Sequence, residues 1–202
     1  MHSKRFLVRR TVAVVAAGAA ALVLVACGGD SDGGDGQAAA SASAAQGTYG
    51  AADVAFAKGM VPHHRQAVEM AGLAAGRARS PEVKKLAEDI EKAQGPEIET
   101  LSGWLVSWGE EVPAPGAMDH SMHSGTGGMM DAEEMDGLKG LSGSAFDTAF
   151  LRMMIEHHNG AVAMAEVEQA DGAYAPAKAM AGDIIASQTA EITRMNDLLG
   201  QD

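Results

Sequence analysis

Cysteine, aromatic residues and basic residues are all scarce in this 202-residue sequence, which has one cysteine, two tryptophans and two tyrosines. A single cysteine excludes an intrachain disulfide, so stability has to come from the core and from any bound metal. The 15 basic residues face 27 acidic ones, and this negative balance argues against nucleic acid as a partner. The sequence also lacks a phosphate-binding loop, a cofactor motif and a nucleophile with its base. We therefore expect a binding protein rather than an enzyme.

The first residues have the pattern of a secretory lipoprotein signal. Four basic residues precede an apolar run from Val12 to Val25, which is too short to span a bilayer and ends in Leu-Val-Ala-Cys27. We expect residues 1–26 to be a signal peptide and Cys27 to carry the lipid, which would hold the protein at the outer face of the cell membrane or in the periplasm. Residues 27–50, rich in Gly, Asp, Ala and Ser, are predicted to form a flexible tether.

The most specific feature of the remaining chain is an internal duplication with a constant offset of 94 residues. Residues 56–105 align with residues 150–199 without a gap, and 16 of the 50 positions are identical. Both copies begin with the pattern F-x3-M-x2-HH-x2-AV-x-MA. The duplicated unit is therefore an adjacent pair of histidines with a methionine on either side.

Hydrophobic periodicity and capping residues predict an all-α fold. We expect helices from about Asp53 to Arg77, from Ser80-Pro81 to Gly109, from a capping-box-like Ser144 to Gly172, and from Pro176 to Gly200. Each copy then forms a helical hairpin. Two such hairpins bury their apolar stripes most simply as an antiparallel four-helix bundle.

The bundle is expected to occupy residues 51–202 as one domain. Repeat 1 covers 53–109 and repeat 2 covers 144–200. A long Met/His-rich loop over 110–143 is expected to join them.

The histidines and methionines of each copy fall on the core-facing side of their predicted helix. Thioether sulfur is a soft donor and imidazole a borderline one, so this set suits Cu(I), with Cu(II) held through the histidines. A methionine stripe alone would more often be ordinary core. The candidate ligands on the helices are Met60, His63, His64, Met70, Met154, His157, His158 and Met164.

The predicted loop adds a second set of soft donors. It holds five methionines and two histidines among polar residues and glycines, which we interpret as exposed ligands that capture Cu(I) rather than as core. The alternative is a disordered spacer with biased composition. The candidate ligands in the loop are Met118, His120, Met122 and His123.

At these residues the chain resembles the family called domain of unknown function 305, whose motif F-x3-M-x2-HH-x2-A is followed by a helix of the form A-x2-I-x3-Q-x2-EI. The second motif is matched by Ala87, Ile90, Gln94, Glu97 and Ile98, and again by Ala181, Ile184, Gln188, Glu191 and Ile192. The resemblance implies a ferritin-like four-helix bundle found in exported proteins, some of them copper-binding or copper-resistance factors.

Two departures separate the copies. The first has Gly59 and Pro62 where the second has Met153 and Glu156, so equal metal affinity of the two copies is not expected.

Together these features predict a lipid-anchored protein that sequesters copper or delivers it to a partner not yet known. Two alternatives remain open. An iron- or manganese-binding bundle would normally carry Glu-x-x-His pairs, and the residues three positions before the histidines are Met or an aliphatic residue instead. A metal-free interaction lipoprotein would use the histidines to hydrogen-bond Glu97 and Glu191 inside the bundle.

The lipid anchor can be tested by replacing its attachment residue. We expect Cys27→Ser to move the protein from the membrane to the soluble fraction, or to block removal of the signal peptide. Fractionation followed by mass determination of the mature chain would show this. A variant that is still processed and still membrane-bound would contradict the assignment.

Overall fold

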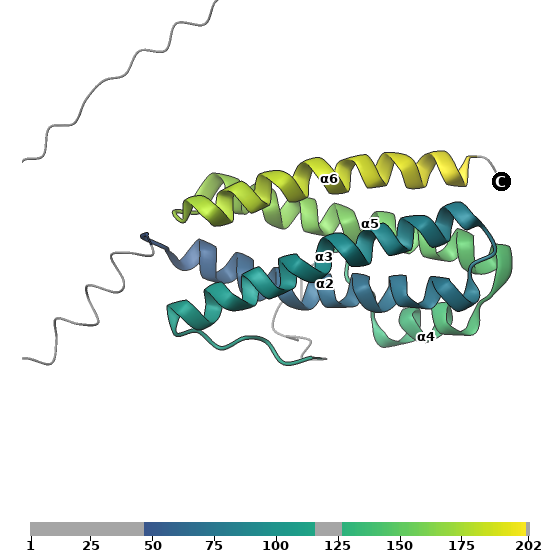
Figure 1. The fold of residues 1–202 in the computed structure, drawn as a ribbon, viewed down its shortest axis with the longest axis horizontal. Coiled ribbons are helices and arrows are strands. Elements are labelled where there is room, and N and C mark those ends of the chain that lie inside the picture. Colours follow the sequence, from purple (N-terminus) through teal and green to yellow (C-terminus); the bar gives the residue numbers. More distant parts are fainter. Residues whose placement is uncertain (1–46, 116–126, 201–202) are drawn as a thin grey trace, which may run out of the picture. The chain divides into compact units, whose positions relative to one another are not determined.

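The structure, a computed structural model, describes residues 47–115 and 127–200, and it confirms the all-α class. Among these residues there is no strand, and no helix has both the length and the apolar composition needed to cross a membrane. Cys27 and the candidate ligands between Met118 and His123 lie outside the described residues. The helices are α2 (Ala51–Arg77), α3 (Pro81–Trp108), α4 (Ala132–Gly140), α5 (Gly143–Asp171) and α6 (Ala175–Leu199) (Figure 1).

The four long helices form the predicted antiparallel bundle. The pairs α2/α3 and α5/α6 are the two hairpins, and α2 packs against α5 between them (Figure 1). The core is divided into two apolar clusters along the helices. One, which we call the α4-end cluster, includes Leu86, Phe150 and Leu138 of α4. The other, the Trp-end cluster, includes Phe56, Leu101 and Trp108.

Most helix boundaries lie where the sequence predicts them. Ser80 accepts hydrogen bonds from the backbone N–H groups of Glu82 and Val83. Helix α3 ends at Trp108 and is capped by Gly109, whose φ of 76° favours glycine. The capping box predicted at Ser144 is wrong. Helix α5 begins at Gly143, after Ser142.

The expected loop between the repeats contains a fifth helix. Asp131 and Glu134 form a reciprocal capping box that starts α4, and Met135 of this helix is buried. Met130, just before the helix, is also buried, and both of its backbone polar groups bond to the side chain of Gln66. Interpreting every methionine of this segment as an exposed ligand was therefore wrong, because Met130 and Met135 pack in the α4-end cluster.

Two buried aspartates, one from each repeat, connect the hairpins to each other. The carboxylate of Asp147 on α5 accepts from the N–H groups of Arg79 (3.0 Å) and Ser80 (2.9 Å) in the α2–α3 turn. The carboxylate of Asp53 on α2 accepts from the N–H groups of Ala173 (3.1 Å) and Tyr174 (2.8 Å) in the α5–α6 turn. Each hairpin turn is thus stabilised by the first helix of the other repeat.

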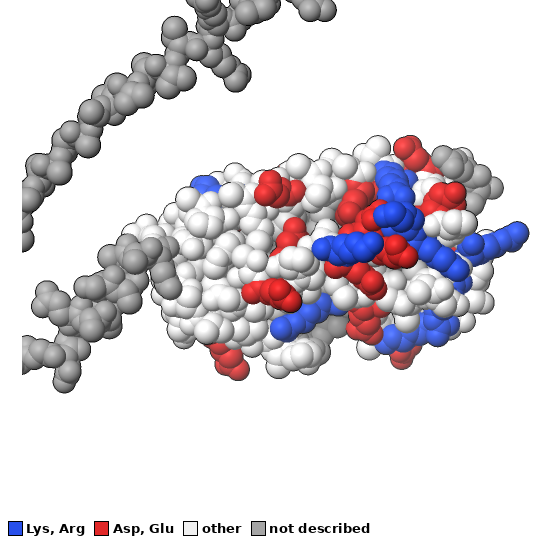
Figure 2. All heavy atoms as spheres, in the orientation of Figure 1, with Lys and Arg blue, Asp and Glu red and all other residues white. Residues whose placement is uncertain are grey.

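Charged side chains on one face form an ion pair between α3 and α6, the second helices of the two repeats. Asp89 of α3 forms ion pairs with Lys85 on its own helix and with Arg194 of α6, at 3.4 Å. Figure 2 shows charged residues of both signs gathered over one part of this face, while much of the remainder is uncharged. Exposed pairs of this kind contribute little individually.

The two ends of the bundle differ because repeat 2 carries Glu168 where repeat 1 has Ala74. Glu168 is 1% exposed, and burial together with the neighbouring Asp53 carboxyl raises its pKa to about 8. Burial alone would also raise the pKa of Asp53, but backbone donors, with Tyr174 the strongest, outweigh it and lower that pKa. Glu168 therefore holds a proton beside an ionised Asp53 at neutral pH.

This buried acid predicts a specific pH dependence of stability. The unfolded chain releases the Glu168 proton near its ordinary pKa of 4.5, whereas the folded chain keeps it until about 8. The free energy of unfolding should therefore fall as the pH rises between these values. Gln does not titrate, so the free energy of unfolding of Glu168→Gln should lack this decrease. Measured relative to the parent protein, the stability of the variant should therefore be about 1–2 kcal/mol greater at pH 9 than at pH 5.5, after allowance for solvent screening.

Urea denaturation at both pH values measures this difference. Glu166→Gln is the matched control, because it removes an exposed carboxylate from the same helix. A Glu168→Gln difference that is the same at pH 5.5 and pH 9 would show that Glu168 does not titrate in this range.

Candidate metal centre

A layer of polar side chains separates the two apolar clusters, and all four long helices contribute to it. On each helix the layer lies between the residues of the α4-end cluster and those of the Trp-end cluster. Members related by the duplication occupy equivalent places. We call this set the histidine layer, and it consists of His63, His64, Gln94, Glu97, His157, His158, Gln188 and Glu191.

His63 and His157 meet at the centre of the layer, where α2 packs against α5. Their ring centroids are 3.7 Å apart, with 40° between the ring planes. Each ring lies more than 6 Å from the next histidine on its own helix. The structure therefore brings together one histidine from each sequence-predicted pair.

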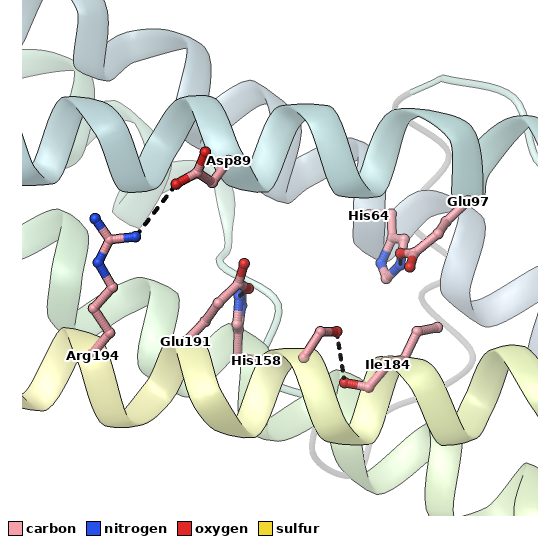
Figure 3. Close-up of polar contacts among 8 residues, drawn as sticks. His64, Asp89, Glu97, His158, Ile184, Glu191 and Arg194 are labelled. Atoms are coloured by element: carbon pink, nitrogen blue, oxygen red, sulfur yellow. Dashed lines mark hydrogen bonds and ion pairs between the residues drawn. The ribbon is translucent and has the colours of Figure 1, made fainter. Parts of the chain in front are cut away.

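The other two histidines each bind a glutamate of the adjacent helix. His64 Nε2 lies 2.7 Å from Glu97, and His158 Nε2 lies 2.7 Å from Glu191 (Figure 3). Both rings are fully buried, whereas the glutamate side chains are about one-fifth exposed, at 22% and 20%. The histidine layer thus reaches solvent at its two carboxylates.

A glycine turn closes the layer beside His63 and breaks its symmetry. The Gly127 carbonyl accepts a hydrogen bond of 2.9 Å from His63 Nε2, while both ring nitrogens of His157 lack a partner. A Cβ at Gly160 of α5 would lie 1.3 Å from that carbonyl oxygen, and one at Gly128 would lie 2.2 Å from the Glu156 carbonyl oxygen. Glycine at both positions lets the turn lie directly on α5.

Sequence reasoning missed this turn. The available signal was a pair of glycines near the middle of the 110–143 segment, together with Gly160 in the position that repeat 1 gives to Gln66.

Burial keeps the central rings neutral. It lowers the pKa of His63 to about 3, and it lowers the pKa of His157 well below the ordinary value, with the neighbouring imidazoles adding to the effect. A neutral imidazole keeps the lone pair that a metal requires. An unperturbed imidazole would lose it near pH 6.5.

The four helical methionines lie on both sides of the histidine layer, one from each repeat on each side. Met60 belongs to the Trp-end cluster and Met164 packs against it, close to α2, since a Cβ at Gly59 would lie 3.4 Å from its sulfur. Met70 and Met154 belong to the α4-end cluster. Three of them are fully buried, and Met164 is partly exposed.

Imidazole nitrogens and thioether sulfurs make up the candidate donor set, and these donors suit a soft or borderline ion better than a hard one. Five of the eight ring nitrogens in the layer are buried without a hydrogen-bond partner. In the part of the chain that the structure describes, no three His, Cys, Asp or Glu side chains converge as a ready chelate.

Sharing one ion between His63 and His157 would require a small movement. A metal–nitrogen bond of about 2.0 Å puts an imidazole centroid roughly 3 Å from the ion, so the two centroids would have to be about 4.5 Å apart or more. The two ring centroids, now 3.7 Å apart, would therefore have to separate by about an ångström or more.

The profile of one protein family, described as domain of unknown function (DUF305), matches residues 53–199. The chain belongs to the DUF305 family. The match covers both repeats and the whole histidine layer. No curated protein sequence matches the chain.

Solved DUF305 structures share this fold. One, from Streptomyces coelicolor and provisionally assigned as secreted, is 35% identical, with a TM-score of 0.68 over 74% of this chain and 93% of that one. A DUF305 fragment from Deinococcus radiodurans is 30% identical, with a TM-score of 0.68 over 76% of this chain and 99% of that one.

A third similar structure carries metal. CopM in its Cu(II)-bound form is 35% identical, with a TM-score of 0.64 over 74% of this chain and 96% of that one. CopM has also been solved in Cu(I)-bound, Ag-bound and apo forms.

Proposed function

We propose that this DUF305 protein is an exported, lipid-anchored copper-binding protein that sequesters Cu(I) or delivers it, and that acts by binding rather than by catalysis. The helical ligands are drawn from the histidine layer and from the methionines on either side of it. The candidate ligands between Met118 and His123 would capture the ion first. The proposal includes a partner protein that accepts the metal, and it assigns no surface of this protein to that partner.

One observation carries this proposal: five buried ring nitrogens without partners are gathered in one layer between methionine-containing clusters. Buried polar atoms normally have hydrogen-bond partners, and leaving one without a partner costs about 1–3 kcal/mol. Each neutral ring offers one nitrogen lone pair, which metal ligation would use. The structures of CopM with Cu(I), Cu(II) and Ag support copper as the ion.

Export is supported by the N-terminal sequence and by the Streptomyces coelicolor relative that is provisionally assigned as secreted. Lipid attachment depends on the Cys27 motif alone.

The metal-free alternative is favoured by one specific observation, the two His–Glu hydrogen bonds of 2.7 Å. A purely structural role explains these contacts for His64 and His158. It gives no account of His157, which has no hydrogen-bond partner for either nitrogen. His157 is therefore the residue at which the two functions predict different results.

Replacing His157 by leucine separates a ligand from a structural residue. Because the ring makes no hydrogen bond, an apolar side chain of similar size should leave the free energy of unfolding unchanged or raise it by about 1 kcal/mol. If His157 is a ligand, the affinity for Cu(I) should fall at least tenfold, which is about 1.4 kcal/mol. Urea denaturation and competition with a Cu(I) chelator under reducing conditions measure the two quantities.

The titration is best run with Met118, His120, Met122 and His123 replaced by serine, so that the loop cannot mask the helical site. Deleting the whole loop is unsuitable, because Met130 and Met135 belong to the core. Ser102→Ala is the control, since it removes a buried unpartnered oxygen from outside the histidine layer without removing an imidazole. Unchanged Cu(I) affinity in His157→Leu would contradict the proposal, as would the absence of tight Cu(I) binding in the parent protein.

A further inference from the structure

Three of the four buried histidines meet an acceptor oxygen through the same ring atom. The Nε2 atoms of His64 and His158 lie 2.7 Å from Glu97 and Glu191, and His63 Nε2 lies 2.9 Å from the Gly127 carbonyl. A carbonyl or carboxylate oxygen accepts a hydrogen bond and has no proton to give. The contact therefore requires the proton of each ring to be on Nε2.

The other nitrogen of each of these rings is buried and free. Nδ1 has no partner in His63, His64 or His158. A neutral imidazole carries one proton, so a proton fixed on Nε2 leaves the lone pair on Nδ1. A proton placed on Nδ1 instead would be a buried donor without an acceptor.

We propose that Glu97, Glu191 and the Gly127 carbonyl are positioning groups that fix the Nε2–H tautomer, so that Nδ1 is the metal-binding atom of His63, His64 and His158. The assignment of Nδ1 as the ligand atom rests on the proposed copper-binding function. The assignment of the Nε2–H tautomer does not. A carboxylate behind a ligating imidazole orients the ring and increases its basicity. The duplication placed such a carboxylate in both repeats, as Glu97 and Glu191.

His157 is the exception among these four rings. Neither of its nitrogens has a partner at normal hydrogen-bond geometry, and the His63 backbone acts on the ring only weakly. The tautomer and the ring orientation of His157 are therefore held less firmly than those of the other three rings. Its ring lies against His63, whose own proton is directed to Gly127. Of the two central rings, His157 is therefore the one free to turn when an ion is bound.

Nitrogen NMR of the full-length protein in a chelator tests the tautomers directly. Long-range proton–nitrogen correlations should show Nε2 as the protonated nitrogen and Nδ1 as the unprotonated one in His63, His64 and His158. His157 should show both forms in exchange. A proton on Nδ1 of His64 or His158 would overturn the proposal.

Silver(I), which is closed-shell and suits NMR, then tests the ligand atom. On adding Ag(I), the Nδ1 resonances of the binding histidines should shift while their Nε2–H protons remain. Loss of the Nε2–H protons would mean ligation through Nε2 and would overturn this inference alone. Absence of any Ag(I) binding would overturn its ligand half together with the proposed function, and would leave the tautomer assignment in place.

Variants test the positioning role of the carboxylates. Glu97→Leu with Glu191→Leu should weaken Cu(I) binding about 10- to 100-fold. Glu97→Gln with Glu191→Gln should recover most of this loss, because an amide oxygen can accept the same hydrogen bond. The control is Glu99→Leu with Asp183→Leu, which removes two exposed carboxylates from the same two helices.

Binding by the leucine pair that is as tight as in this control would overturn the proposal. If the double leucine variant does not fold, the double glutamine variant provides the test of the positioning role. It should keep the Nε2–H tautomer and an affinity within about tenfold of the parent protein, and loss of both would overturn the proposal.

The Gly127 acceptor is tested through Gly160, on which it packs. A Cβ there would lie 1.3 Å from the Gly127 oxygen, so Gly160→Ala should displace the carbonyl and let His63 exchange between tautomers, as His157 does. Gly76→Ala is the matched control, because no atom lies within 4 Å of a Cβ added at that helical glycine. A His63 tautomer that is unchanged in Gly160→Ala would remove Gly127 from the positioning groups.

Discussion

Burying four imidazoles in one layer of a helical bundle is the constraint around which this fold is arranged. Each ring brings two polar atoms into the interior, and a buried polar atom without a partner costs about 1–3 kcal/mol. Three rings recover part of this through Glu97, Glu191 and Gly127. The apolar clusters on both sides of the histidine layer have to provide the remaining stability, because a second cysteine for a disulfide is absent from the sequence.

The duplication explains both the symmetry of the molecule and its useful departures from symmetry. Equivalent aspartates stabilise the opposite hairpin turns, and equivalent glutamates hold equivalent histidines. The connection between the repeats can occupy only one side of this arrangement. It lies on α5 at Gly160 and bonds His63, so His157 is left without a partner. One central histidine is fixed and the other is free, which suits a site that has to adjust to an incoming ion.

Much of the fold could be predicted from the sequence because the decisive signals are local and repeated. Ser80-Pro81 and Gly109 mark the ends of α3, and the repeated motif predicts which helix faces are buried. Long-range contacts could not be predicted in this way. Asp147 lies three residues after Ser144, which is the spacing of a capping box, but its carboxylate binds the α2–α3 turn instead. Only the packing of the two repeats determines this contact.

The same limit applies to the candidate site. The histidines, and Glu97 and Glu191 as their possible acceptors, could be identified from the motif. Which histidines meet at the centre depends on how α2 and α5 pack, because adjacent residues on a helix point in different directions. Composition was also misleading for Met130 and Met135. A methionine in a polar segment can still be core when a short helix such as α4 buries it.

The central claim is that the histidine layer is the metal site, and anomalous diffraction from crystals grown with Cu(I) tests it most directly. The account predicts an anomalous copper peak within bonding distance of Nδ1 of at least one histidine of the layer. It also predicts that the His63 and His157 ring centroids separate beyond their present 3.7 Å if both bind the ion. Copper found only outside the bundle, with the four rings unmoved, would contradict the account.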